Sequence, residues 1–201
     1  MNNDWHKKPL DPTDVRSLST RHGIDLLAAS IFTRREITGQ EEIRYFLEDD
    51  LSLLHNPYLF HDMDVVVERI LQARDEGEKV LVFGDRDADG ITSTVLMIEA
   101  LNDLGIVAEW ALPLGDDPYG LTREALDRFA ATDGTLLITV DCGISNHDEI
   151  EHGNSLGIDT IVIDHHNPQE LLPQAYAIIN PKIEDTGYPF RDLAGCGVAV
   201  K

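Results

Sequence analysis

The hydrophobic and polar positions change their rhythm near Gly77 of this 201-residue chain. Before that glycine, apolar residues recur at spacings of three and four, which is typical of amphipathic helices. The stretch TGQE at 38–41 has the form of a capping box and predicts the start of one helix. Another helix is predicted over 64–74, ending near Gly77. We therefore predict a small helical N-terminal segment over residues 1–77.

After Gly77, short apolar runs alternate with helical patterns. Strands are predicted at 80–83, 106–112, 136–140, 158–163 and 176–179, and helices at 91–104, 121–130 and 147–156. Alternation of this kind is typical of right-handed βαβ units, which build a mainly parallel sheet with helices on both faces. The fold class expected for residues 78–201 is therefore α/β.

Acidic residues and histidines follow three of the predicted strands. They are Asp85, Asp87 and Asp89 after the first strand, Asp141 after the third, and Asp164, His165 and His166 after the fourth. The carboxyl ends of parallel strands meet at one edge of the sheet, where open α/β sheets bind their ligands. Side chains that are distant in sequence are therefore expected to converge on one crevice.

Two simpler interpretations compete with a functional one. An aspartate often caps a helix N-terminus, and this reading remains open for each of these residues taken singly. The stretch DRDADG also opens like a calcium-binding EF-hand loop. That interpretation fails because Leu96 stands at the twelfth position, where a bidentate glutamate is required.

Crowded carboxylates raise one another's pKa and destabilise the fold unless a cation or a proton lies between them. Carboxylates combined with imidazole are typical ligands of Mn²⁺, Mg²⁺ or Fe²⁺. Two such ions at one site can clamp the attacking and leaving oxygens of a phosphoryl displacement. We therefore predict a centre for two divalent cations at the carboxyl edge of the sheet.

The amino-acid composition limits the cellular compartment and the binding partners that we expect. Cys142 and Cys196 have no CxxC partner, so a disulfide framework is not expected and a reducing cytoplasm fits best. No apolar run approaches the roughly 20 residues of a membrane span, and no membrane association is expected. The formal net charge of −21 argues against a broad nucleic-acid-binding surface, because phosphate binding depends on lysine and arginine.

The motifs GDRDADG, VDCGIS and IDHH, each after a predicted strand, resemble those of the DHH phosphoesterases. Within that superfamily, INPK, YPFRDLAG and GCGVAVK resemble segments of RecJ-type single-stranded-DNA-specific exonucleases. The resemblance implies metal-dependent hydrolysis of single-stranded DNA from its 5′ end to mononucleotides, in recombination and repair. It also implies Mn²⁺ or Mg²⁺ as the two cations, a monomer, and a single-strand-binding protein and a helicase as partners.

The resemblance implies roles for individual residues. The implied metal ligands are Asp87, Asp89, Asp141 and His165, with Asp85 at or next to the site. Asp141 would bridge the metals, Asp164 would orient the neighbouring histidine, and His166 would contact the scissile phosphate, so that the catalytic set is Asp141, His165 and His166. The implied substrate contacts are Arg86, Lys182, Gly195 and Gly197.

Some features depart from the family pattern or leave alternatives open. Arg86 stands where an aromatic residue is usual, and it could stabilise the acids, contact a phosphate or be a neutral loop substitution. The chain ends inside an expected helix, so we expect a DHH domain truncated at its C-terminus that is nearly inactive alone. The alternatives are a phosphodiesterase for short oligoribonucleotides or cyclic dinucleotides, a related pyrophosphatase, and a catalytically inactive replication scaffold.

Overall fold

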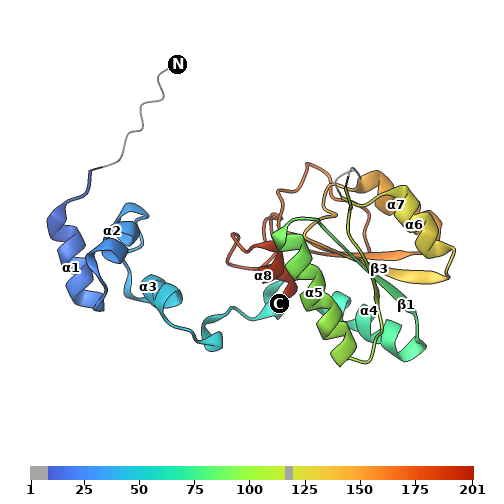
Figure 1. The fold of residues 1–201 in the computed structure, drawn as a ribbon, viewed down its shortest axis with the longest axis horizontal. Coiled ribbons are helices and arrows are strands. Elements are labelled where there is room, and N and C mark those ends of the chain that lie inside the picture. Colours follow the sequence, from blue (N-terminus) through green and yellow to red (C-terminus); the bar gives the residue numbers. More distant parts are fainter. Residues whose placement is uncertain (1–8, 116–119) are drawn as a thin grey trace, which may run out of the picture. The chain divides into compact units, whose positions relative to one another are not determined.

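The computed structural model describes residues 9–115 and 120–201 (Figure 1). The chain divides into two compact units between Leu54 and His55. Within residues 9–54, the N-terminal unit contains the helical elements α1 (Pro12–His22), α2 (Leu26–Arg34), α3 (Gln40–Leu47) and the 3₁₀ turn η1 (Leu51–Leu53). Asp11 and Asp25 cap α1 and α2, since each carboxylate accepts a hydrogen bond from a backbone N–H of the first turn. A small core holds this unit together, made of Val15, Leu18, Ala29 and Ile43.

The start of α3 differs from the prediction by one residue. Gly39 is the N-cap, and its backbone N–H donates to Glu42 Oε2 at 3.0 Å. The prediction that the capping box spans 38–41 is therefore wrong. A capping glutamate must be the third helical residue to reach back to the N-cap N–H, and here that residue is Glu42 instead of Glu41.

The second unit is an α/β sheet domain. Its strands are β1 (Lys79–Gly84), β2 (Glu109–Ala111), β3 (Gly134–Val140), β4 (Asp159–Ile163) and β5 (Ala177–Ile179). They pair in the order β2-β1-β3-β4-β5, and every pairing is parallel. The helical elements are η2 (Pro57–Leu59), α4 (Met63–Glu76), α5 (Ala88–Asp103), α6 (Arg123–Ala130), α7 (His147–Ser155) and α8 (Gly195–Ala199).

Helices cover both faces of the sheet, because successive strand residues point to opposite sides. Val80 and Val82 of β1 lie in one core with residues of α4, α5 and α8. Leu81 and Phe83 lie in the other core with residues of α6 and α7. Figure 1 shows α6 and α7 on one side of β1 and β3, with α4 and α5 on the other. The predicted α/β class with helices on both faces is confirmed.

Helix α4 packs with the sheet, although it falls within the helical segment that the sequence pattern defined. Its residues Met63, Val66 and Ala73 belong to the same core as β1 and β3. It ends at Gly77, which adopts the left-handed conformation with φ of 67°.

Within the described residues, no helix is long and apolar enough to cross a membrane.

Candidate metal centre

The predicted acids lie at the point where the order of the sheet reverses. The strand order 2-1-3-4-5 places this switch between β1 and β3, where helices leave for opposite faces and open a crevice beyond the carboxyl ends of the strands. Asp85 follows β1, and Asp141 follows β3. The Asp164–His166 turn follows β4. Sheet topology thus brings together groups that are separated by up to about eighty residues in sequence.

Two clusters of possible metal ligands form there. One contains Asp85, Asp87 and Asp141, and the other contains Asp141, His165 and His166. Within each cluster, one ligand atom from every residue lies within 4.8 Å of the others. Asp141 belongs to both clusters. The arrangement therefore has the form of two adjacent cation sites with a shared carboxylate.

Asp141 is the most constrained member. Its side chain is 1% exposed, and its backbone is left-handed with φ of 59°, a conformation that non-glycine residues seldom adopt. Burial raises the pKa of its carboxyl group to about 7, with further upward contributions from the charges of Asp89 and Asp87. Among the described residues, no group donates a hydrogen bond to Asp141 Oδ1. A buried carboxylate oxygen without a donor is what a cation would stabilise.

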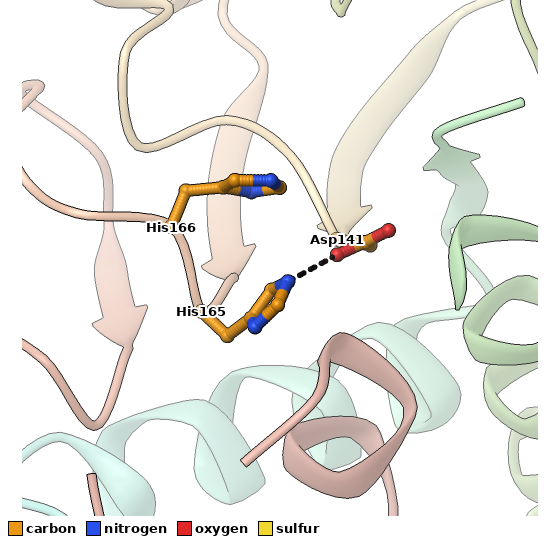
Figure 2. Close-up of side chains that lie close together, drawn as sticks. All are labelled: Asp141, His165 and His166. Atoms are coloured by element: carbon orange, nitrogen blue, oxygen red, sulfur yellow. Dashed lines mark ion pairs between the residues drawn. The ribbon is translucent and has the colours of Figure 1, made fainter. Parts of the chain in front are cut away.

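The imidazole ring of His165 faces this carboxylate. Its Nδ1 lies 3.0 Å from the carbonyl oxygen of Leu193, which can only accept, so Nδ1 carries a proton. Its Nε2 points toward Asp141 Oδ1 at 3.1 Å (Figure 2). The same nitrogen lies 3.6 Å from Asp89 Oδ2. A proton or a cation between Nε2 and the Asp141 carboxylate would hold the two groups together. Backbone support of the distal nitrogen is common in metal-binding histidines.

Asp164 holds the second histidine. Its Oδ1 accepts from His166 Nδ1 at 2.8 Å and from the backbone N–H of His166 at 3.0 Å, while its Oδ2 accepts from Ile144 N–H at 3.0 Å. Burial raises the pKa of Asp164, but the bonds from His166 and Ile144 outweigh it and the net shift is downward. The same bond from His166 to Asp164 raises the pKa of His166. Asp164 therefore remains charged and orients the imidazole of His166.

The other two acids have backbone partners. Asp87 is the N-cap of α5, and its Oδ1 accepts from the N–H groups of Asp89 and Gly90. The capping interpretation thus holds for Asp87, which also belongs to a ligand cluster. Both oxygens of Asp89 accept from the N–H groups of Gly195 and Cys196, at 2.7 Å each. Burial raises the pKa of Asp89, but these bonds outweigh it and lower the pKa. Asp89 lies outside both clusters.

The predicted substrate contacts are dispersed. Arg86 donates to the carbonyl oxygen of Gly115 at 3.1 Å, and Lys182 lies in the loop after β5. At Gly195, an added Cβ would lie 2.4 Å from Asp141 Oδ1, so this close approach requires glycine. At Gly197, an added Cβ would meet its nearest neighbour, Leu193, at 3.4 Å. The structure therefore gives Gly195, but not Gly197, a contact with the ligand clusters.

Sequence reasoning missed the contributions of the 193–196 segment. The carbonyl group of Leu193 selects the tautomer of His165, and the N–H groups of Gly195 and Cys196 hold Asp89. Because these partners are backbone atoms, only the glycine at 195 could have marked the close approach in sequence.

The residues present fit a pair of hard divalent cations. The donors are carboxylate oxygens and imidazole nitrogens, which suit Mn²⁺ and Mg²⁺. Buried oxygens of Asp85 and Asp141 lack any hydrogen-bond donor in the part of the chain that the structure describes. The two cysteines are uninvolved in either cluster, so thiolate ligation that would favour zinc is not indicated.

Comparison with known proteins shows similarity to RecJ exonucleases. The chain is 35% identical to the single-stranded-DNA-specific exonuclease RecJ of Bacillus subtilis over 198 residues, which cover 98% of this chain and 25% of that protein. It is 45% identical to RecJ of Escherichia coli over 139 residues, covering 68% of this chain and 24% of that protein. The chain thus spans about a quarter of the length of these curated relatives.

Solved structures agree in fold. A crystal structure of RecJ from Thermus thermophilus in complex with Mn²⁺ matches with a TM-score of 0.69 and 26% identity, covering 94% of this chain and 26% of that one. A manganese-bound exonuclease RecJ matches with a TM-score of 0.63 and 30% identity, covering 75% and 37%. Residues 79–201 match the family described as DHH family, N-terminal domain. The predicted resemblance is therefore confirmed, and the chain belongs to the DHH family.

Proposed function

We propose that this chain carries the metal centre of an enzyme that hydrolyses phosphodiester bonds in single-stranded DNA. The observation that carries the proposal is that His165 Nε2 lies 3.1 Å from the buried Asp141 Oδ1, a separation at which both atoms can bind one cation. The similarity to RecJ exonucleases, two structures of which are described with Mn²⁺, supports both the substrate and the metal.

The two clusters define the proposed ligands. Asp85 and Asp87 would hold one Mn²⁺ or Mg²⁺, His165 would hold the other, and Asp141 would bridge them. When bound, such a pair supplies a hydroxide nucleophile near neutral pH and stabilises charge on the phosphate oxygens. Asp89 remains a proposed ligand through its Oδ2, which lies 3.6 Å from His165 Nε2.

The surrounding groups have positioning roles in this proposal. The charged Asp164 orients His166, which would contact the scissile phosphate. Gly195 allows the α8 backbone to approach Asp141, and its N–H helps to hold Asp89. Arg86 and Lys182 are the proposed cationic contacts to the DNA backbone, which the strongly acidic remainder of the chain would otherwise repel.

The proposal also includes further properties that the resemblance to RecJ exonucleases implies for the enzyme. They are 5′ to 3′ polarity with release of mononucleotides, a role in recombination and repair, a cytoplasmic location, and work alongside a single-strand-binding protein and a helicase. The two unpaired cysteines suit a reducing compartment.

Mn²⁺ binding tests the proposal directly. Calorimetry and electron paramagnetic resonance of the purified chain should detect bound Mn²⁺, and Asp141→Asn should weaken the binding at least about 100-fold because it removes the shared charge. Full-length protein carrying Asp141→Asn should release no nucleotides from 5′-labelled single-stranded DNA. Asp133→Asn is the matched control, since Asp133 also has a positive φ but precedes β3 at the opposite edge. Unchanged Mn²⁺ affinity in Asp141→Asn would refute the proposed centre.

A further inference from the structure

A cavity of about 630 Å³ lies between the loops that follow β4 and β5. Its lining includes the apolar side chains of Pro168, Leu172 and Ile183 and the cationic side chains of Lys182 and Arg191. We call it the β4–β5 cavity. Its volume lies within the range of about 300–1,000 Å³ that is usual for small-molecule sites.

A buried asparagine connects this cavity to the metal centre. Asn180 directly follows β5 and is completely buried. Its Nδ2 donates to the carbonyl oxygen of His166 at 3.0 Å, and its Oδ1 accepts from the backbone N–H of Lys182 at 2.8 Å. One amide group therefore fixes the backbone of a candidate metal ligand relative to the backbone of a cavity residue.

The cations of the cavity form no direct ion pair with a carboxylate in the described part of the chain, although Glu170 and Glu184 also line the cavity. Across residues 9–115 and 120–201, no aspartate or glutamate forms an ion pair with Lys182 or Arg191. Arg191 Nη2 donates to the carbonyl oxygens of Lys182 and Ile183, which hold the guanidinium group in place without cancelling its charge. In a chain with a net charge of −21, two cations without a direct carboxylate partner can contact an anionic group of a ligand.

The rest of the lining limits the kind of anion. Glu170 and Glu184 also border the cavity, so a ligand of high negative charge would be repelled. The apolar surfaces of Pro168, Leu172 and Ile183 can pack against a weakly polar group of a ligand. A nucleotide combines one phosphate with such a group, whereas inorganic phosphate or a polyphosphate offers only charge.

We propose that the β4–β5 cavity binds the nucleotide that adjoins the scissile phosphodiester. Lys182 contacts its phosphate, the apolar wall packs against its base, and Asn180 is a positioning residue that sets the spacing between this subsite and His166. The inference rests on the proposed function and adds a substrate subsite to it.

Methyl-labelled NMR of the metal-free 201-residue chain tests the subsite, with a 5′-phosphorylated thymidine dinucleotide as the probe. Methyl signals of Leu172 and Ile183 should shift on titration, and Lys182→Gln should weaken the affinity roughly tenfold by removing a charge-assisted bond. Lys79→Gln is the matched control, because Lys79 lies at the start of β1 on the opposite edge and should leave the affinity unchanged. Unshifted methyl signals at millimolar dinucleotide, or equal affinity in Lys182→Gln, would overturn the subsite.

A second variant separates the subsite from the metal centre. Asn180→Asp keeps the acceptor for Lys182 N–H but loses the donor to the His166 carbonyl group, so it should weaken dinucleotide binding severalfold with little change in Mn²⁺ affinity. Equal losses of both affinities, together with a lower melting midpoint, would show a purely structural role and overturn the positioning assignment. If Asp141→Asn abolishes Mn²⁺ binding while Lys182→Gln binds the dinucleotide normally, the proposed function stands and the subsite falls. If the dinucleotide occupies the cavity but Mn²⁺ does not bind, the metal function falls instead.

Discussion

Buried charged groups lie at both edges of the central sheet, where the strands begin and where they end, but they differ in their hydrogen-bond partners. At the edge where the strands begin, the guanidinium of Arg69 is 4% exposed and donates to both oxygens of Glu78 and to Asp159 Oδ2, each at 2.8 Å. Thr135 adds a further bond to Glu78. At the edge where the strands end, buried oxygens of Asp85 and Asp141 have no donor among the described residues.

The pKa directions follow this difference. The hydrogen bonds from Arg69 lower the pKa of Glu78, whereas burial beside other carboxylates raises the pKa of Asp141. A buried charge whose partners are all present in the chain fastens elements together, here α4 to the starts of β1 and β4. A buried charge whose partners are missing indicates a place for a ligand. The comparison therefore separates a structural charge cluster from a functional one within one sheet.

The largest expected effect on stability lies at the paired edge. Arg69→Met should lower the free energy of unfolding by about 3 kcal/mol, because it leaves the largely buried carboxylate of Glu78 without its partner. Urea denaturation measures the change. Arg74→Ala, which breaks the exposed pair of Arg74 with Asp75, should change it by less than about 1 kcal/mol. Equal stability losses in the two variants would remove the distinction between buried and exposed pairs.

At the edge where the strands end, removal of a buried charge is expected to raise the free energy of unfolding when no metal is bound. The pKa of Asp141 is about 7 in the folded chain and near its ordinary value of 3.8 when unfolded, so its contribution to stability is lost as pH rises from about 4 to about 7. In chelator at pH 8, Asp141→Asn should therefore be more stable than the native chain, by on the order of 2 kcal/mol. Saturating Mn²⁺ should reverse the order, since only the native chain gains a tightly bound ligand. A destabilised Asp141→Asn in chelator would contradict this account of the site.

Metal affinity should depend on pH for the same reason. Below pH 7 a cation must displace the proton that Asp141 retains, so Mn²⁺ affinity should rise about tenfold per pH unit from this group between pH 5 and 7 and level off above pH 7. Calorimetric titrations in several buffers would show the accompanying proton release. An affinity that is constant from pH 5 to 8 would mean that Asp141 is already ionised in the free chain.

The smallest effect is expected from a pair of glycines in α8. Gly195→Ala places a Cβ 2.4 Å from Asp141 Oδ1 and should lower the free energy of unfolding by about 1–2 kcal/mol, with weaker Mn²⁺ binding. Gly197→Ala places its Cβ 3.4 Å from Leu193 and should have little effect on Mn²⁺ binding. Thermal melting and Mn²⁺ titration of both variants under the same conditions test this difference in stability and in Mn²⁺ affinity. If Gly197→Ala weakens Mn²⁺ binding as much as Gly195→Ala does, the close approach to Asp141 is not the reason for glycine at 195.

Much of this protein follows from local sequence pattern. The β1, β3 and β4 strands lie where apolar runs predict them, because β-branched residues buried on both faces leave few other choices. Parallel pairing then places Asp85, Asp141 and His165 at one edge, whatever the details of packing. The helix starts are less determined, and the error of one residue at α3 arose because a glycine can also serve as an N-cap.

Tertiary structure alone decided which charges are satisfied. The sequence by itself determined that acids gather at the carboxyl edge, but not that the oxygens of Asp89 are held by backbone groups 106 and 107 residues away. It gave no sign that Arg69 pairs with an aspartate 90 residues away, or that Leu193 selects the tautomer of His165. The physical reason is that a residue's type specifies which hydrogen bonds it can make. Whether those bonds form depends on donors and acceptors, many of them backbone groups, that only the folded chain brings within reach.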